Sequence, residues 1–143
     1  MLDVVRPATH VHRVRVYYED TDAGGIVYYA NYLKYAERGR TEFLRELCGD
    51  DYARMLESGM GFVVRRCSVD YDRPARLDDL LEVHSQIVEL GAASLSAKQV
   101  VRREDNELVR MLVDLACVDR GGRPARIPPP LRQALEDFRA NVG

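Results

Sequence analysis

Apolar and polar residues alternate along several stretches of the chain, as they do in β-strands with one buried face. From Val11 onward, Val14, Val16 and Tyr18 fall on one face and charged or polar residues on the other. The same pattern predicts four further strands, at 62–71, 80–90, 94–103 and 108–118. The last stretch is nearly continuous in apolar residues, so we expect it to be a central and buried strand.

A period of three and four residues replaces the alternation between about residues 30 and 48. The apolar positions of this stretch form one stripe: Tyr32, Ala36, Gly39, Phe43 and Leu47. Such a stripe predicts a long amphipathic helix. Because glycine costs a helix about 1 kcal/mol relative to alanine, Gly39 within the stripe indicates a close approach of the helix to a sheet. Shorter helices are predicted at 51–58 and 131–141.

One long helix among antiparallel strands predicts a two-layer α+β fold, with a sheet of about five strands curled around the helix and a further C-terminal helix. The last three strands are close enough in sequence to form a meander, whereas the first two are separated by helices and need not be neighbours. The outer face of the sheet would stay open unless the C-terminal helix or a second copy covers it, so we expect an oligomer. The length of 143 residues fits one domain over 1–143.

Composition and charge narrow the class of protein. The formal net charge is −2, with 21 basic and 23 acidic side chains, so no basic excess favours nucleic acid as a partner. No apolar stretch is long enough to span a membrane, and the N-terminal residues are too polar for a secretion signal. Cys48, Cys67 and Cys117 are odd in number and widely spaced, which argues against a disulfide framework or a metal site. We expect three small buried residues in a reducing, cytoplasmic protein.

The densest candidate chemistry lies between the first strand and the long helix, in the stretch YYEDTDAGGIVYYANY at 17–32. The stretch carries three carboxylates and no lysine or arginine. Asp22 stands immediately before Ala23, Gly24 and Gly25, and glycines allow a sharp backbone path and the close approach of a ligand. The pattern therefore predicts an acidic turn that opens into a helix.

Residues on the helical side of this turn can hold a carbonyl group. Val27, Tyr28 and Tyr29 supply apolar and aromatic walls just before the helix. A carbonyl oxygen at the helix start would meet free N–H groups and the positive end of the helix dipole, while Asp22 could attack the carbonyl carbon or activate a water. These parts fit hydrolysis of an activated acyl group. The spacing equally fits Asp20 and Asp22 shaping the turn and capping the helix.

The run YYEDTDAGGIVYYANYLKYAERGRTEFLRE resembles the hot-dog-fold acyl-CoA thioesterases of the 4-hydroxybenzoyl-CoA thioesterase superfamily, in particular the bacterial Tol–Pal-associated (YbgC-type) branch. The resemblance continues through 62–66, 74–79 and 117–119 and covers roughly residues 12–135. It implies an antiparallel sheet wrapped around a helix. It also implies homodimers that pair their sheets edge to edge, often assembled into homotetramers, with active sites at the dimer interface.

The resemblance assigns roles position by position. Asp22 matches the catalytic aspartate, and Tyr29 matches the position whose backbone N–H polarises the thioester carbonyl. Gly24 and Gly25 match the loop that leads there. Many members of the Tol–Pal branch carry histidine where this chain has Tyr29 and the 4-hydroxybenzoyl type has tyrosine; the backbone donor survives that exchange. No metal and no organic cofactor are implied, since coenzyme A is part of the substrate.

We therefore expect an acyl-CoA thioesterase that releases a free acid and coenzyme A from a short-chain aliphatic or an aromatic acyl-CoA. The alternative is a module of the same fold that binds acyl carrier protein or an envelope partner and turns over slowly or not at all. A hot-dog dehydratase would need a histidine for proton abstraction, and no histidine lies near the acidic turn in sequence. The expected catalytic residues are Asp22 and Tyr29, and the expected substrate-binding residues are Gly24, Gly25, Val27 and Tyr28.

Other charged residues carry weaker signals. Glu37 lies on the long helix, where some hot-dog thioesterases use a carboxylate, but it can pair with Arg40 or Thr41 and we expect a structural role. Asp114 is a lone carboxylate in an apolar strand, and we expect it to face solvent or a subunit contact. Several arginines could meet the phosphates of coenzyme A, and they suit solvated strand faces at least as well: Arg65, Arg66, Arg73, Arg76, Arg102 and Arg103.

Overall fold

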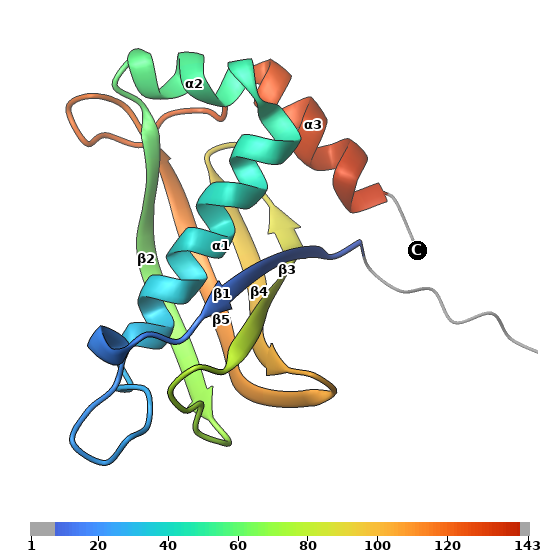
Figure 1. The fold of residues 1–143 in the computed structure, drawn as a ribbon. Coiled ribbons are helices and arrows are strands. Elements are labelled where there is room, and N and C mark those ends of the chain that lie inside the picture. Colours follow the sequence, from blue (N-terminus) through green and yellow to red (C-terminus); the bar gives the residue numbers. More distant parts are fainter. Residues whose placement is uncertain (1–7, 141–143) are drawn as a thin grey trace, which may run out of the picture.

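The alternating stretches of the sequence pair into one antiparallel sheet in the computed structural model, which describes residues 8–140. The strand order is β1-β3-β4-β5-β2 (Figure 1). The expected meander is confirmed by β3, β4 and β5, while β1 and β2 lie at opposite edges. The bounds are β1 His10–Arg15, β2 Gly61–Tyr71, β3 Leu80–Leu90, β4 Ser94–Arg103 and β5 Asn106–Val118.

Three α-helices and one short 3-10 turn complete the described part of the chain: α1 Asn31–Cys48, α2 Asp50–Glu57, α3 Pro129–Ala140 and the 3-10 turn Tyr18–Asp20. The sheet curls around α1, which is the expected α+β, hot-dog arrangement (Figure 1). Helix α3 contacts α1 and β3 on the side of the sheet that holds α1. The outer face of the sheet therefore has no helix over it. The N-terminal stretch 1–7 and the predicted last residue of α3, at 141, lie outside the described residues.

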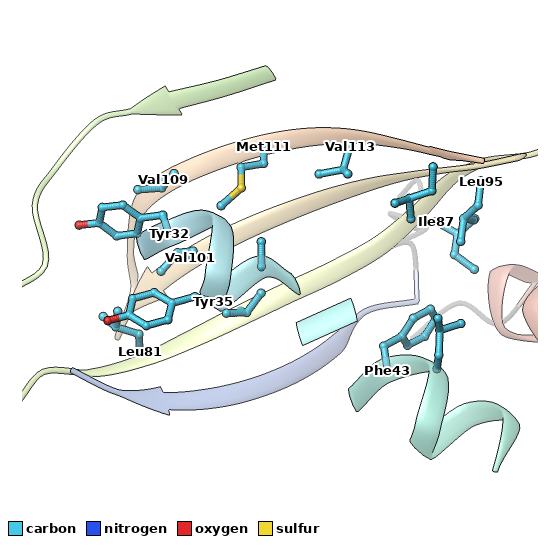
Figure 2. Packing of buried hydrophobic residues seen from close by; sticks show 14 of the residues in the cluster. Tyr32, Tyr35, Phe43, Leu81, Ile87, Leu95, Val101, Val109, Met111 and Val113 are labelled. Carbon is cyan, nitrogen blue, oxygen red and sulfur yellow. The ribbon is translucent and has the colours of Figure 1, made fainter. Parts of the chain in front are cut away.

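The apolar stripe of α1 lies against the sheet as its spacing predicts. Tyr32, Ala36, Gly39 and Phe43 are buried, and Figure 2 shows Tyr32 and Tyr35 beside the inward side chains of the strands. A Cβ at Gly39 would come within 2.7 Å of the Val83 Cγ1 atom. The close approach predicted from Gly39 is therefore confirmed, and only a residue without a side chain fits there.

A buried polar group fastens the middle of α1 to the sheet. Gln99 on β4 is fully buried, and its Nε2 donates to the Ala36 carbonyl and to Ser85 Oγ, each at 2.9 Å. Its Oε1 accepts a hydrogen bond from Arg40 Nη1, also at 2.9 Å. Burial lowers the pKa of Arg40, although a guanidinium remains charged at neutral pH. Each polar atom of the Gln99 amide is therefore paired inside the core.

Two expectations about individual residues are wrong. Tyr18 does not continue the first strand; β1 ends at Arg15 and Tyr18 is 81% exposed. Cys67 is exposed, unlike the buried Cys48 and Cys117, because it lies on the edge strand β2. The expectation of a buried interior strand at 108–118 is confirmed, since β5 is flanked by β4 and β2. Both errors concern where a strand ends or lies in the sheet, which local periodicity does not specify.

Candidate active site

The acidic turn is a loop whose two arms are hydrogen-bonded to each other. Thr21 and Val27 form an isolated antiparallel bridge, and the Asp22 N–H donates to the Ile26 carbonyl at 2.9 Å. Gly25 has a φ of 78°, a left-handed conformation that glycine adopts without steric cost. These contacts give the backbone around Asp22 a defined path out of the 3-10 turn and back towards α1.

The Asp22 side chain closes this turn from within. Its Oδ1 accepts the Gly24 N–H at 2.8 Å, and its backbone carbonyl accepts the Gly25 N–H at 3.0 Å. Asp22 thus shapes the turn, which confirms that part of the structural interpretation of the sequence. The residue is exposed, and Oδ2 has no hydrogen-bond partner within residues 8–140. One carboxylate oxygen is held by the backbone and the other is available to a ligand.

A second set of hydrogen bonds joins the loop to the start of α1. The Asp20 carbonyl accepts both the Tyr28 N–H at 2.9 Å and Asn31 Nδ2 at 2.8 Å. Asn31 is only 8% exposed, so this carbonyl satisfies a buried donor. The arm that leaves β1 and the arm that enters α1 are therefore fastened together directly before the helix.

The start of α1 has no capping side chain. Its N-cap residue is Ala30, and its first turn contains no acidic residue. The prediction that Asp20 or Asp22 caps α1 is therefore wrong. The Asp20 carboxylate instead accepts the Tyr17 N–H across the 3-10 turn at 2.8 Å. The Tyr29 N–H, just before the cap, has no acceptor in the part of the chain that the structure describes. An unpaired N–H beside the positive end of a helix dipole stabilises negative charge on an oxygen.

An open cavity of about 280 Å³ adjoins this helix start. Tyrosine rings from three segments line it: Tyr29 from the loop, Tyr32 from α1 and Tyr71 from the end of β2. The Tyr71 ring centroid is 6.0 Å from that of Tyr29 and 5.8 Å from that of Tyr32. Burial raises the pKa of Tyr32, whose hydroxyl accepts the Ala75 N–H at 2.9 Å. The remaining lining residues are Ile26, Val27, Asp72, Arg73 and Pro74.

The structure brings only some of the expected site residues into this cavity. Val27 and Tyr29 line it. Asp22, Gly24 and Gly25 lie in the loop that projects beyond the end of the sheet (Figure 1). Tyr28 lies beside Tyr29, with ring centroids 4.9 Å apart, but is not part of the lining. A larger depression of about 710 Å³, bounded by residues such as Arg15, Tyr18 and Leu77, includes no residue of the helix start.

The other candidate residues have structural partners. Glu37 accepts a hydrogen bond from the Thr41 hydroxyl at 2.9 Å, one of its two expected pairings. Asp114 lies on the outer face of the sheet and accepts the Ser96 hydroxyl at 2.7 Å. Within residues 8–140, no group of three or more His, Cys, Asp or Glu side chains is arranged to hold a metal ion. Over the same range, no helix is both long and apolar enough to cross a membrane.

Sequence reasoning did not single out Asn31 or Tyr71. An asparagine next to a predicted helix start is a common hydrogen-bonding residue. Its partner here, the Asp20 carbonyl 11 residues earlier, is visible only in the fold. The alternation of 62–71 does not reveal that Tyr71 meets the helix start, because that contact depends on which end of β2 adjoins the loop. Both residues belong to the surroundings of the unpaired Tyr29 N–H.

Comparison with known proteins identifies the class of this fold and site. Residues 14–135 match the family model described as the thioesterase-like superfamily. A Haemophilus influenzae protein named acyl-CoA thioesterase YbgC is 41% identical over 127 residues, which cover 88% of this chain and 93% of that protein. An Escherichia coli protein named acyl-CoA thioester hydrolase YbgC is 48% identical over 107 residues, covering 74% of this chain and 79% of that one.

Solved structures agree with these relatives. The crystal structure of a probable thioesterase from Bartonella henselae superposes with a TM-score of 0.76 at 36% sequence identity, covering 85% of this chain and 99% of that chain. The fold, the family model and the relatives all define a thioester-hydrolysing enzyme. The chain belongs to the thioesterase-like superfamily.

Proposed function

We propose that this enzyme hydrolyses the thioester of an acyl-CoA, with a short-chain aliphatic or an aromatic acyl group, at the start of α1. The observation that carries the proposal is the unpaired Tyr29 N–H at an uncapped helix start, next to an aromatic cavity. The names of the H. influenzae and E. coli relatives support acyl-CoA as the substrate class. The absence of a basic excess and of a membrane-spanning helix within residues 8–140 is compatible with a cytoplasmic enzyme.

The Tyr29 N–H and Asp22 have different roles in this proposal. The N–H donates to the thioester carbonyl oxygen and stabilises the negative charge that develops there. Asp22 then acts in one of two ways. Its carboxylate attacks the carbonyl carbon, the C–S bond breaks, and water hydrolyses the resulting anhydride. Alternatively, it takes a proton from water, hydroxide adds to the carbonyl, and the thiolate leaves and is protonated. Both routes consume one water and give a free acid and coenzyme A.

The remaining expected site residues serve this geometry. Gly24 and Gly25 allow the sharp path of the loop, and Gly24 donates its N–H to the Asp22 carboxylate. Val27 supplies an apolar wall of the cavity, and Tyr28 extends the aromatic surface outward from Tyr29. We propose no metal and no cofactor beyond the coenzyme A of the substrate.

A second copy of the chain completes the site in our proposal. Strand β2 has 11 residues, lies at the sheet edge and is largely exposed, with Val63 at 46%, Val64 at 51% and Tyr71 at 47%. A long apolar edge strand is a template for pairing with another strand. Edge-to-edge pairing through β2 would place a partner chain beside Tyr71, the β2 residue that lines the cavity. The resulting homodimers can assemble further into homotetramers.

The test is release of coenzyme A thiol from a panel of acyl-CoAs, from acetyl to decanoyl and including benzoyl. We expect turnover by the natural chain and a loss of about 10²–10⁴-fold in kcat for Asp22→Asn. Glu19→Gln is the matched control, since Glu19 is an exposed carboxylate of the same segment. If both the natural chain and Asp22→Asn are equally slow while acyl carrier protein still binds, the molecule is the non-catalytic binding module instead.

Two further measurements examine the mechanism and the assembly. Label that enters the Asp22 carboxylate during repeated turnover in heavy-oxygen water shows an anhydride that water opens at the Asp22 carbonyl carbon, because an Asp22 that only activates water gains no label. Sedimentation at micromolar concentration should give a dimer or a tetramer. A monomer that is fully active would contradict a site completed by a partner.

A further inference from the structure

Tyr71 occupies a distinctive position at the end of an edge strand. It is the last residue of β2 and pairs with Val109 of β5. Residues directly opposite each other in an antiparallel pair project to the same face, and Val109 is fully buried on the face that holds α1. Tyr71 therefore projects towards α1, although β2 is an edge strand within residues 8–140 and Tyr71 is 47% exposed.

Tyr71 is the middle ring of a continuous row of five tyrosines. Tyr28 contacts Tyr29 at 4.9 Å, Tyr29 contacts Tyr71 at 6.0 Å, and Tyr71 contacts Tyr32 at 5.8 Å between ring centroids. Tyr32 in turn lies 6.1 Å from Tyr35. The exposed end of the row is at the acidic loop and the buried end is in the core. Tyr71 is the one ring of the row that comes from the sheet, and it lines the cavity together with Tyr29 and Tyr32.

The open cavity that Tyr29, Tyr32 and Tyr71 line is small. Its volume of about 280 Å³ lies just below the range of about 300–1,000 Å³ that is usual for small-molecule sites. Behind Tyr71, β2 continues along α1 with the inward-facing Val69 and Cys67, which pair with Met111 and Val113. A smaller side chain at 71 would thus connect the cavity to an apolar surface along the strand.

We propose that Tyr71 determines the size of the acyl group by closing the cavity beside the Tyr29 N–H on its β2 side. Compact acyl groups fit in front of the ring, and extended chains are excluded by it. The inference rests on the proposed thioesterase reaction at Tyr29 and deepens it by naming a specificity-determining residue.

The test compares kcat and KM for butyryl-, octanoyl- and decanoyl-CoA among the natural chain and the variants Tyr71→Ala, Tyr71→Phe and Tyr71→Trp. We expect Tyr71→Ala to raise the octanoyl-to-butyryl ratio of kcat/KM by about tenfold or more, since a few methylenes in an apolar pocket are worth at least that much. Tyr71→Phe keeps the ring and should keep the ratio, while Tyr71→Trp should lower it. Tyr18→Ala removes an exposed tyrosine outside the cavity and should leave the ratio unchanged.

Each outcome separates this inference from the proposed function. A ratio of two substrates in one preparation does not depend on the folded fraction, so a merely structural role for Tyr71 would not move it. If the natural chain is active and neither Tyr71→Ala nor Tyr71→Trp changes the ratio, the inference is overturned. The same holds if Tyr71→Phe shifts the ratio as far as Tyr71→Ala, because the hydroxyl rather than the ring size would then be responsible. If the natural chain cleaves no acyl-CoA, the proposed function itself fails. If Tyr71→Ala does not fold, Tyr71→Trp carries the test.

Discussion

The middle of α1 and its N-terminal end are packed against the same sheet, but they differ in how completely their polar groups are hydrogen-bonded. In the middle, Gln99 makes three hydrogen bonds in the core and Gly39 lets the helix touch Val83. At the N-terminal end, the Tyr29 N–H has no acceptor within the described residues and the Tyr29 ring is 62% exposed. Unpaired polar groups and exposed aromatic surface lower stability. These features gather at the N-terminal end of the helix, which is the end where we propose that the substrate binds.

The largest effect on stability should come from the middle of α1. Replacing Gln99 by Met keeps the volume but leaves Arg40 Nη1, the Ser85 hydroxyl and the Ala36 carbonyl without this partner. We expect the free energy of unfolding to fall by about 1–3 kcal/mol, measured by denaturant titration, with unchanged activity per folded molecule. Lys98→Met on the exposed face of the same strand is the control. Loss of activity without loss of stability would contradict the separation of the two regions.

The link between the two regions is Asn31. Asn31→Ala removes the buried donor to the Asp20 carbonyl and should cost about 1 kcal/mol of unfolding free energy. Because this bond positions the acidic loop against the helix start, kcat should also fall, by about tenfold or more, as misplaced catalytic groups do. Gln133→Ala, at an exposed amide on α3 away from the site, serves as the comparison. An Asn31→Ala variant that is destabilised yet retains full kcat would show that the bond has no role in positioning.

A methyl group at Gly25, in the acidic loop, would meet no neighbouring atom, but the backbone conformation of this residue is unfavourable for alanine. Gly25 and Gly61 both have open space where a Cβ would lie, but only Gly25 has a left-handed φ, at 78°. Gly25→Ala should therefore cost about 1 kcal/mol, whereas Gly61→Ala should be close to neutral. Thermal unfolding of the two variants side by side measures the difference. Equal melting temperatures would argue against a defined loop conformation.

The smallest effect on stability should come from Tyr29→Ala. Its ring is exposed and the donor that we propose for catalysis is its main-chain N–H, so the free energy of unfolding should change by no more than about 0.5 kcal/mol. We expect KM to change several-fold with kcat largely kept, because the cavity wall is altered and the donor is not. Total loss of activity with normal folding would contradict a backbone role for Tyr29.

Local periodicity was sufficient to predict the elements and their buried faces. The stripe from Tyr32 to Phe43 and the meander of β3, β4 and β5 depend on neighbours in sequence, and both are as expected. The acidic turn, with Asp22 bonded to the Gly24 N–H, also follows from local residue types.

Contacts between distant segments could not be predicted in this way. The position of β2 at the sheet edge decides that Cys67 is exposed, and the end of β2 decides that Tyr71 meets Tyr29. Likewise, the early end of β1 exposes Tyr18 although the alternation continues through it. The shape of the cavity depends on these long-range contacts, and local residue types therefore did not predict it.

The most direct test of the central claim separates binding from chemistry in Asp22→Asn. Calorimetry with a non-cleavable thioether analogue of an acyl-CoA gives the Kd for the natural chain and for the variant, and single-turnover measurement with the acyl-CoA itself gives the rate of cleavage. The account predicts a Kd within about threefold of the natural chain, because the amide can keep the turn closed, and cleavage slowed at least about 10²-fold. Unchanged cleavage, or lost binding with a normal melting temperature, would contradict the assignment of Asp22 to the chemical step.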